Sequence, residues 1–248
     1  MRFAAIYDIH GNLPALEAVL TDIHDSSVDH VVIGGDVLPG PMPKECFDLL
    51  LSLDLPTTYI VGNGDREVLA CLRGETTGWF RSARDEWREP VSWSADKLGS
   101  TYKQHLESWR TTCTFEIPGI GKTLFCHATP QSDTEVFTKL TEEVRLMKMF
   151  GGVDAQNIVC GHTHMQFDRS FVGIRILNAG SVGMPYGEPG AYWLLFDSAV
   201  QFRCTQYDFA QAARRVEETE FPGARAFANN QILCPPTESS MLDAFSKW

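Results

Sequence analysis

Short apolar runs alternate with helical patterns over the first 61 residues of the chain. The runs over 3–6, 30–33 and 57–61 are rich in strand formers, and polar residues follow each of them. Continuous apolar runs of this length are typical of strands buried in a parallel sheet. Residues 13–24 place leucine, valine and isoleucine on one helical face, and residues 44–53 form a second helical pattern. The pattern predicts strand, helix, strand, helix, strand, as in parallel strands joined by crossovers.

The remaining chain mixes strand patterns, helical patterns and two segments that fit neither. We expect a hairpin over 112–126, a helix over 138–150, a strand over 157–160, a hairpin over 167–181, two strands within 190–206 and a helix over 209–220. Residues 66–110 hold four of the six tryptophans and many charges, so we expect a helical flank or cap without strands. Residues 221–248 contain three prolines, and this tail packs on the body, forms an oligomer contact or is mobile.

The size and charge of the chain limit its functions. At 248 residues and 44% hydrophobic composition, we expect a single α/β domain over 1–248. Lys and Arg number 21 against 32 Asp and Glu, so the formal net charge is −11. That balance argues against a stable nucleic acid complex or an anionic membrane surface. It leaves a phosphate ester substrate open, because bound divalent cations can reverse the local charge in a cleft.

The cysteines and the absence of long apolar runs indicate a cytoplasmic protein. Seven cysteines are widely spaced without a CxxC pair, and Cys126 and Cys160 lie in apolar runs where we expect them to be buried. The chain shows no signal peptide, and no apolar run approaches the ~20 residues of a membrane helix. A reducing compartment fits this cysteine usage.

Polar side chains with metal-binding chemistry follow the predicted strands. In open α/β sheets, functional groups lie just past the carboxyl ends of the strands. Each group alone has an ordinary reading, since Gly-Asp and Gly-Asn pairs usually form turns. Together they supply the oxygen and nitrogen ligands that a pair of divalent ions needs to bind and hydrolyse a phosphate ester. The candidate ligands are Asp8, His10, Asp36, Asn63, His127, His162 and His164.

The order of these motifs resembles that of the calcineurin-like metallophosphoesterase superfamily over residues 1 to about 200. The motifs are Asp8-x-His10, Gly35-Asp36, Gly62-Asn63, His127 and Gly161-His162-x-His164. Residues 8–16 and 178–183 are similar to its small bacterial phosphodiesterase branch. The resemblance implies a four-layer α/β/β/α sandwich of two mixed β-sheets, with a dinuclear metal site at the strand ends.

The resemblance also implies how the ligands are divided. Asp8, His10 and His164 would hold the first ion, and Asp36 would bridge to the second. Asn63, His127 and His162 would complete the second site, and a hydroxide between the ions would attack phosphorus. We expect two divalent ions, manganese, iron, nickel, cobalt or zinc. The residues assigned to catalysis are Asp36, His127, His162 and Asp65.

One position departs from the family pattern. Many members have a histidine where this chain has Gly64, and that histidine is thought to protonate the leaving group or bind phosphate. Glycine can do neither, although small bacterial phosphodiesterases of the family commonly lack this histidine too. We expect the adjacent Asp65 to orient His10 or His127 by a hydrogen bond.

Several further residues have more ordinary readings. We expect Asn12 to cap the helix that follows it, and Gly180, Ser181 and Gly183 to shape a loop that borders the site. A substrate contact by Arg66 or Arg81, or base stacking by Trp79, is possible in the flank. A surface arginine and a buried tryptophan are the favoured readings. His24, His30 and His105 match no motif.

The favoured function is metal-dependent hydrolysis of phosphodiester bonds in a small phosphoester or nucleotide. The alternatives are a phosphatase that acts on monoesters, such as a nucleotide, dinucleoside polyphosphate or protein phosphatase, and a scaffold without activity. A relative in the retromer coat has this fold, works as a scaffold and lacks part of the metal set. The sequence leaves the native metal and a homo-oligomer open.

Overall fold

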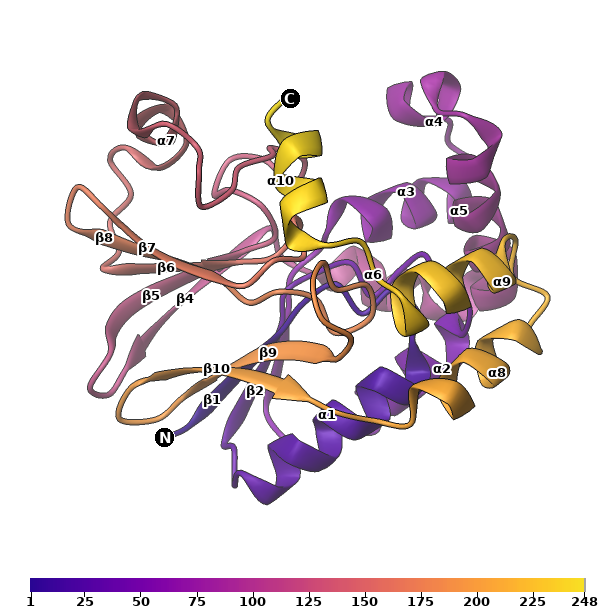
Figure 1. Ribbon diagram of the computed structural model, residues 1–248, viewed down its shortest axis with the longest axis horizontal. Helices are drawn as coiled ribbons and strands as arrows, with labels where there is room; N and C mark the ends of the chain where they lie inside the picture. Colours follow the sequence, from indigo (N-terminus) through magenta and orange to yellow (C-terminus); the bar gives the residue numbers. More distant parts are fainter. Residues whose placement is uncertain (248) are drawn as a thin grey trace.

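The computed structural model describes residues 1–247 and places ten strands in two five-stranded sheets. The first sheet has the order β10-β9-β1-β2-β3, and the second has the order β4-β5-β6-β8-β7. Figure 1 shows the two sheets face to face, with most helices beside the first. The strands are β1 (Phe3–Ile6), β2 (His30–Ile33), β3 (Thr57–Tyr59), β4 (Thr112–Ile117), β5 (Gly121–Cys126), β6 (Asn157–Cys160), β7 (Phe167–Phe171), β8 (Ile174–Asn178), β9 (Ala191–Phe196) and β10 (Val200–Thr205).

Both sheets are mixed, as the sequence predicts. In the first, β1, β2 and β3 are parallel, and β9 pairs antiparallel with β1 and with β10. In the second, β5, β6 and β8 are parallel, while β4 and β7 are antiparallel edge strands. The parallel strands end at the same edge of their sheet, and this brings distant segments of the chain together.

Three apolar cores separate the layers. Alternate residues of β1 face opposite ways: Ala4 and Ile6 pack toward the helices, whereas Phe3 and Ala5 pack between the sheets. Burial on both faces explains why this strand is apolar without alternation. A third core joins the outer face of the second sheet to α7 (Glu143–Phe150). The predicted four-layer sandwich is confirmed, and α7 is the helix whose apolar residues join the outer core of the second sheet.

The helices agree with the prediction in place, and their boundaries differ. Residues 66–110 are mainly helical, and α3 begins three residues before this segment, at Asn63. The helix expected over 138–150 begins at Glu143, and β3 ends at Tyr59 rather than at residue 61. The other helices are α1 (Leu13–Asp25), α2 (Pro43–Leu51), α3 (Asn63–Leu72), α4 (Gly78–Ser82), α5 (Asp85–Leu98), η1 (Gly99–Tyr102), α6 (Lys103–Ser108) and α8 (Phe209–Glu217).

The C-terminal tail packs on the body, which was one of three alternatives. It contains α9 (Ala224–Phe227), a π-helical turn η2 (Ala228–Leu233) and α10 (Glu238–Phe245). Phe227 and Ile232 are buried in the core that α1 and α8 share. In Figure 1 the tail crosses from α8 to the second sheet, where Lys139 pairs with Glu238 at 2.7 Å. None of the helices within residues 1–247 has the length and apolar composition needed to cross a bilayer.

Candidate metal centre

The structure brings all seven candidate ligands to one place at the strand ends. Asp8 and His10 follow β1, Asp36 follows β2, and Asn63 is the first residue of α3. The other three follow strands of the second sheet. His127 comes directly after β5, and His162 and His164 come after β6. The centre therefore lies where the two sheets present their carboxyl ends to each other.

Left-handed backbone is concentrated at this centre. Asp8, His10, Asp36, His162 and His164 all have positive φ, between 47° and 64°. Within residues 1–247 only two other residues besides glycine share this conformation. It costs free energy for residues with a Cβ, and such residues persist where the surroundings hold them, most often at functional sites. The chain thus makes a sharp turn at the ends of β1, β2 and β6, which lead into the centre.

One oxygen of Asp8 has no hydrogen-bond partner. Its Oδ2 atom accepts from the backbone N–H of His162 at 2.8 Å, whereas the buried Oδ1 atom accepts from no group within residues 1–247. That oxygen lies 3.4 Å from Nε2 of His164 and 4.0 Å from Nε2 of both His10 and His127. A buried carboxylate oxygen without a donor is costly, so this geometry calls for a positive charge.

Three histidines turn the same ring nitrogen toward that oxygen. The Nδ1 atoms of His10, His127 and His164 donate to the backbone carbonyls of Pro39 (3.3 Å), Gly34 (3.0 Å) and Met184 (2.7 Å). A proton on Nδ1 leaves Nε2 as a lone pair, the form in which imidazole binds metals. Nε2 of His10 and Nε2 of His164 are only 3.3 Å apart. Two lone pairs at this distance repel each other unless a cation or a proton lies between them.

Asp36 lies between the two predicted ligand sets. Its Oδ1 atom accepts from the backbone N–H of Gly64 at 2.7 Å. Its Oδ2 atom lies 3.8 Å from Nε2 of His10 and 3.6 Å from Nε2 of His127. The two histidines belong to different ions in the division that the family resemblance implies, so this oxygen has the position of a bridging ligand.

The side chain of Asn63 faces the remaining two rings. The terminal amide atom that points into the centre lies 3.2 Å from Nε2 of His127 and 3.0 Å from Nδ1 of His162. With no cation, the amide nitrogen would take this position and donate to both rings. With a cation, the amide oxygen would face it instead. Asn63 is therefore suited to ion binding through a simple rotation of its amide group.

The electrostatic environment favours neutral His10 and His162 beside a charged Asp8, whereas Asp8 raises the pKa of His164 against the effect of burial. Burial lowers the pKa of His10 and of His162 to about 3, so both are neutral at physiological pH. Burial alone would raise the pKa of Asp8, but His164, His127 and His10 outweigh it and lower that pKa to about 2. Burial and the charge of Asp8 raise the pKa of Asp36 well above its usual value. A divalent cation beside Asp36 would stabilise the charged form of its carboxylate and lower that pKa.

The donor set fits divalent ions. Ions that bind ligands at about 2.1 Å hold neighbouring ligand atoms about 3.0–3.4 Å apart. The nitrogen and oxygen distances in this centre run from 3.0 to 4.0 Å, close to such a coordination shell. Two compact groups of donors overlap at Asp8: one adds His10 and His164, and the other adds Asp36 and His127. Mixed carboxylate, amide and imidazole ligands suit manganese, iron, cobalt, nickel or zinc.

The prediction that Asp65 orients a histidine is wrong. Asp65 is buried, and its carboxylate accepts from the backbone N–H groups of Asp36 (2.7 Å), Leu38 (3.0 Å) and Gly62 (3.0 Å). The histidines use backbone carbonyls instead, because the strand-end turns bring those carbonyls within reach of Nδ1. Asp65 thus ties the loop after β2 to the start of α3. It positions Asp36 and Asn63 through the backbone and touches neither ring.

Gly64 is required by packing. A Cβ atom there would overlap the carbonyl oxygen of Leu38 and would lie 2.9 Å from Cδ of Pro39 and 3.1 Å from Oδ1 of Asp36. The loop after β2 fills the space that a side chain would need. A histidine cannot stand at this position with the present backbone, because the chain leaves no room for its side chain.

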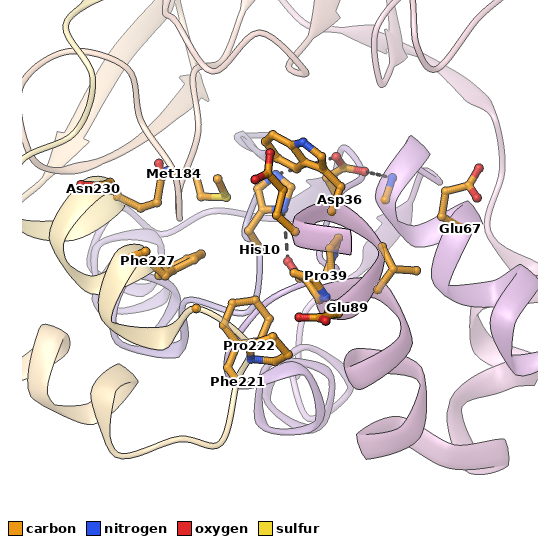
Figure 2. A pocket seen from close by; sticks show the side chains of 18 of the residues that line it. His10, Asp36, Pro39, Glu67, Glu89, Met184, Phe221, Pro222, Phe227 and Asn230 are labelled. Carbon is orange, nitrogen blue, oxygen red and sulfur yellow. Dashed lines mark hydrogen bonds and ion pairs between the residues drawn. The ribbon is translucent and has the colours of Figure 1, made fainter. Parts of the chain in front are cut away.

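A cavity of about 510 Å³ opens beside the centre. His10, Asp36 and Asn63 line its floor, helices of the flank line one wall, and the tail lines the other. Figure 2 shows His10 and Asp36 between Glu67 and Glu89 of the flank and Phe227 and Asn230 of the tail. The motifs that carry the family resemblance lie outside the flank and the tail, so the walls of this cavity come from segments without such a motif.

The flank residues singled out from the sequence have different environments. Arg66 pairs with Asp133 and Glu67, each at 2.6 Å, and thereby joins α3 to the loop after β5. Arg81 is exposed, as expected. The expectation of a buried Trp79 is wrong: its side chain is 42% exposed and lines the cavity, because α4 projects from the body.

The expectations for the supporting loops hold. The side chain of Asn12 caps α1 by accepting from the backbone N–H of Ala15 at 3.3 Å. The hydroxyl of Ser181 donates to the backbone carbonyl of Asp8 at 2.7 Å, so this loop supports the end of β1. Cys126 and Cys160 are buried and free. His24 and His105 are exposed, and His30 bonds to Thr58 at 2.9 Å.

Sequence reasoning missed residues whose role depends on distant segments. Tyr186 stacks on the ring of His164 with centroids 5.0 Å apart, and the tail residues Asn230 and Gln231 reach the cavity. Asp133 holds Arg66 near Asn63. The glycine-rich segment around 180–190 was a weak signal for the role of Tyr186. The tail carries no motif that points to the centre.

Comparisons with known proteins agree with this geometry. A sequence model described as the calcineurin-like phosphoesterase superfamily domain matches residues 1–199. The chain is 28% identical over 247 aligned residues to the uncharacterized protein MJ0912 of Methanocaldococcus jannaschii. The alignment covers 90% of this chain and 96% of that protein.

Two solved structures share the fold over nearly the whole chain. The hypothetical protein PH1004 from Pyrococcus horikoshii OT3 superposes with a TM-score of 0.79 at 17% identity, covering 95% of this chain and 99% of the other. A metallophosphoesterase from Sphaerobacter thermophilus superposes with a TM-score of 0.70 at 24% identity, covering 92% and 97%. With the family match over residues 1–199 and the two mixed sheets, these findings show that the chain belongs to the calcineurin-like phosphoesterase superfamily.

Proposed function

We propose that this protein is a metal-dependent phosphodiesterase with a dinuclear centre. The observation that carries the proposal is the buried, unpartnered oxygen of Asp8, which faces the Nε2 atoms of three histidines. A buried carboxylate oxygen facing three imidazoles destabilises the fold unless a positive charge lies among them, and bound cations supply that charge. Membership of the superfamily supports phosphoester hydrolysis as the reaction.

The residues divide into two sets around Asp36. Asp8, His10 and His164 would hold one ion, and Asn63, His127 and His162 would hold the other, with Asp36 between them. Two divalent ions in such a site polarise the phosphoryl oxygens and make water a nucleophile near neutral pH. The backbone N–H groups of His162 and Gly64 keep the carboxylates of Asp8 and Asp36 oriented toward the cluster. Asp65 fixes the loop that carries Asp36 against the start of α3, where Asn63 lies.

The cavity supports a diester in preference to a monoester. A monoester carries up to two negative charges, and enzymes that bind a terminal phosphate often clamp it with arginine. The cavity lining within residues 1–247 contains no Lys or Arg. A diester has one charge and two organic arms, and a space of about 510 Å³ beside His10 and Asp36 has room for an arm. We place the enzyme in the cytoplasm on its free cysteines, and we favour manganese among the metals.

The missing histidine at position 64 shapes the expected substrate range. No imidazole stands there to protonate a departing alkoxide, so esters of acidic alcohols should react much faster than those of simple alcohols. This dependence on the leaving group is a second mark of the proposed activity.

The test is hydrolysis of bis(4-nitrophenyl) phosphate and 4-nitrophenyl phosphate in parallel, by chelator-treated protein with and without added Mn²⁺. The proposal expects hydrolysis of the diester that requires metal and exceeds hydrolysis of the monoester. Faster cleavage of the monoester would instead favour a phosphatase. A folded protein that binds metal and cleaves neither ester would favour a scaffold.

A further inference from the structure

The cavity beside the metal centre has a chemical character of its own. Its walls come from the flank helices α4 and α5 and from the tail elements α9 and η2. Neither wall contributes a ligand to the centre. The cavity can therefore hold the part of the substrate that extends away from the reacting phosphate, and the residues that line it indicate the chemistry of that part.

The charged side chains that line the cavity are all acidic. Besides Asp36 of the metal centre they are Glu67, Glu86 and Glu89, with no Lys or Arg among the lining residues that the structure describes. Glu67 is buried and paired with Arg66, and Glu86 is paired with Arg84. Glu89 is exposed and forms no ion pair within residues 1–247. One uncompensated carboxylate thus faces the cavity, and an anionic arm would be repelled by it.

Aromatic side chains line both walls. Trp79 and Trp87 on the flank are 42% and 56% exposed, which is unusual for tryptophan, and Phe221 and Phe227 lie on the tail side. The faces of such rings attract cations and cover short carbon chains. Proteins bind ammonium groups on such aromatic faces, and the carboxylate of Glu89 lines the same cavity.

The tail adds an unsatisfied acceptor. Gln231 belongs to the π-helical turn η2, and its side-chain oxygen is buried without a donor within residues 1–247. π-Helical turns are rare and are frequently found at functional sites. A buried carbonyl oxygen lacking a donor requires one from a ligand or a water molecule. The carboxylate of Glu89 is exposed and hydrated, and it offers a second acceptor from the flank side of the cavity.

We propose that this cavity binds an ammonium-bearing alcohol arm of the phosphodiester, with N–H groups donated to Gln231 and Glu89 and with Trp79 and Trp87 beside the charge. This inference rests on the proposed function and narrows its substrate to phosphodiesters of amino alcohols. Quaternary ammonium arms satisfy the rings and the carboxylate but offer no N–H to Gln231, so primary ammonium arms are preferred.

Three chromogenic diesters test the proposal: 4-nitrophenyl phosphates whose second arm is 2-aminoethyl, propyl or 2-carboxyethyl. In each reaction the oxygen of water bonds to phosphorus, and the bond to 4-nitrophenolate breaks with its electron pair. A proton passes to solvent, and the second arm stays on the phosphate. With Mn²⁺ present, kcat/KM should be at least about tenfold higher for the 2-aminoethyl ester than for the propyl ester, and lowest for the carboxylate.

Variants assign the preference to the cavity. Glu89→Gln and Gln231→Leu should each reduce the ratio between the 2-aminoethyl and propyl esters to within about threefold. Glu116→Gln, on the exposed face of β4, should keep the wild-type ratio and serves as the matched control. Glu89 is exposed, so its variant remains informative even if the Gln231 variant fails to fold.

The outcomes separate this inference from the proposed function. Metal-dependent hydrolysis of all three esters with equal kcat/KM, or with a preference for propyl, overturns the inference and leaves the phosphodiesterase in place. A 4-nitrophenyl phosphocholine that outperforms the 2-aminoethyl ester overturns the part assigned to Gln231. Absence of hydrolysis of every ester by folded, metal-loaded protein refutes the proposed function, and the inference with it.

Discussion

Replacing Asp65 by asparagine tests whether a buried carboxylate that touches no predicted ligand side chain holds the centre together. Its two oxygens accept three backbone N–H groups, from Asp36, Leu38 and Gly62, at 2.7 to 3.0 Å. The amide of asparagine has one acceptor oxygen. In the more favourable orientation of this amide, its oxygen takes the place of Oδ2 and keeps the bonds from Asp36 and Gly62. Its NH₂ group then faces the N–H of Leu38, so two donors face each other where a hydrogen bond was.

The cost follows from the loss of a charge-assisted bond and from the unsatisfied donor. A hydrogen bond to a charged group contributes about 1.5–3 kcal/mol, and a buried polar group without a partner costs about 1–3 kcal/mol. Burial and the charge of Asp36 raise the pKa of Asp65, which removes part of the carboxylate's advantage over the amide. We therefore expect Asp65→Asn to lower the free energy of unfolding by about 3 kcal/mol. In a chain of 248 residues this corresponds to a decrease in Tm of about 6–12 °C.

The assay combines thermal melting with metal analysis, on protein with and without a chelator. Asp65→Asn should melt earlier in both conditions and should retain less metal, because the loops that carry Asp36 and Asn63 lose their shared anchor. Asp25→Asn, on the exposed end of α1, is the matched control and should change stability by less than about 0.5 kcal/mol. An Asp65→Asn protein with wild-type melting and metal content would show that these three bonds do not position the centre.

Three further predictions concern the centre itself. Gly64→Ala should destabilise the protein by about 1–3 kcal/mol or more, because the new Cβ would overlap the carbonyl oxygen of Leu38. Gly78→Ala has open space around its Cβ and should melt within a few degrees of wild type. Equal melting temperatures of the two variants would contradict the packing argument. Asp36→Asn should reduce kcat for an activated diester by about a thousandfold or more and lower the bound metal, as measured by steady-state kinetics and elemental analysis; near-normal turnover would remove Asp36 from the bridging position. At pH 6, binding of Mn²⁺ should release protons, because Asp36 and His164 both have a raised pKa and must lose their protons to bind the ion. His10 and His162, with a pKa of about 3, are already neutral and release none. Calorimetry in buffers of different ionisation enthalpy measures this release, and a binding heat that is independent of the buffer would be the contrary result.

The strand-end ligands could be predicted from the sequence because their signals are local. Each follows a short apolar run, and parallel strands have few allowed arrangements, so Asp8, Asp36 and Asn63 had to meet at one sheet edge. The same reasoning placed His127 and His162 after strands of the second sheet. The order of the motifs supplied the fold, and the two five-stranded sheets agree with it.

Features that depend on contacts between distant loops could not be predicted. The partners of Asp65 belong to the loop after β2, whose path is set by packing against α3 rather than by any local pattern. The reason for Gly64 became visible only with Leu38 and Pro39 in place. The cavity wall formed by Gln231 depends on how an unpatterned tail returns to the centre.

The most direct test of the central claim is a titration of chelator-treated protein with Mn²⁺, in which bound metal and hydrolysis of bis(4-nitrophenyl) phosphate are followed together. We predict that hydrolysis is absent without metal, appears as two ions bind per chain, and is lost in Asp36→Asn. Hydrolysis that persists without metal, or that is unchanged in Asp36→Asn when metal is bound, would contradict a dinuclear centre at these residues.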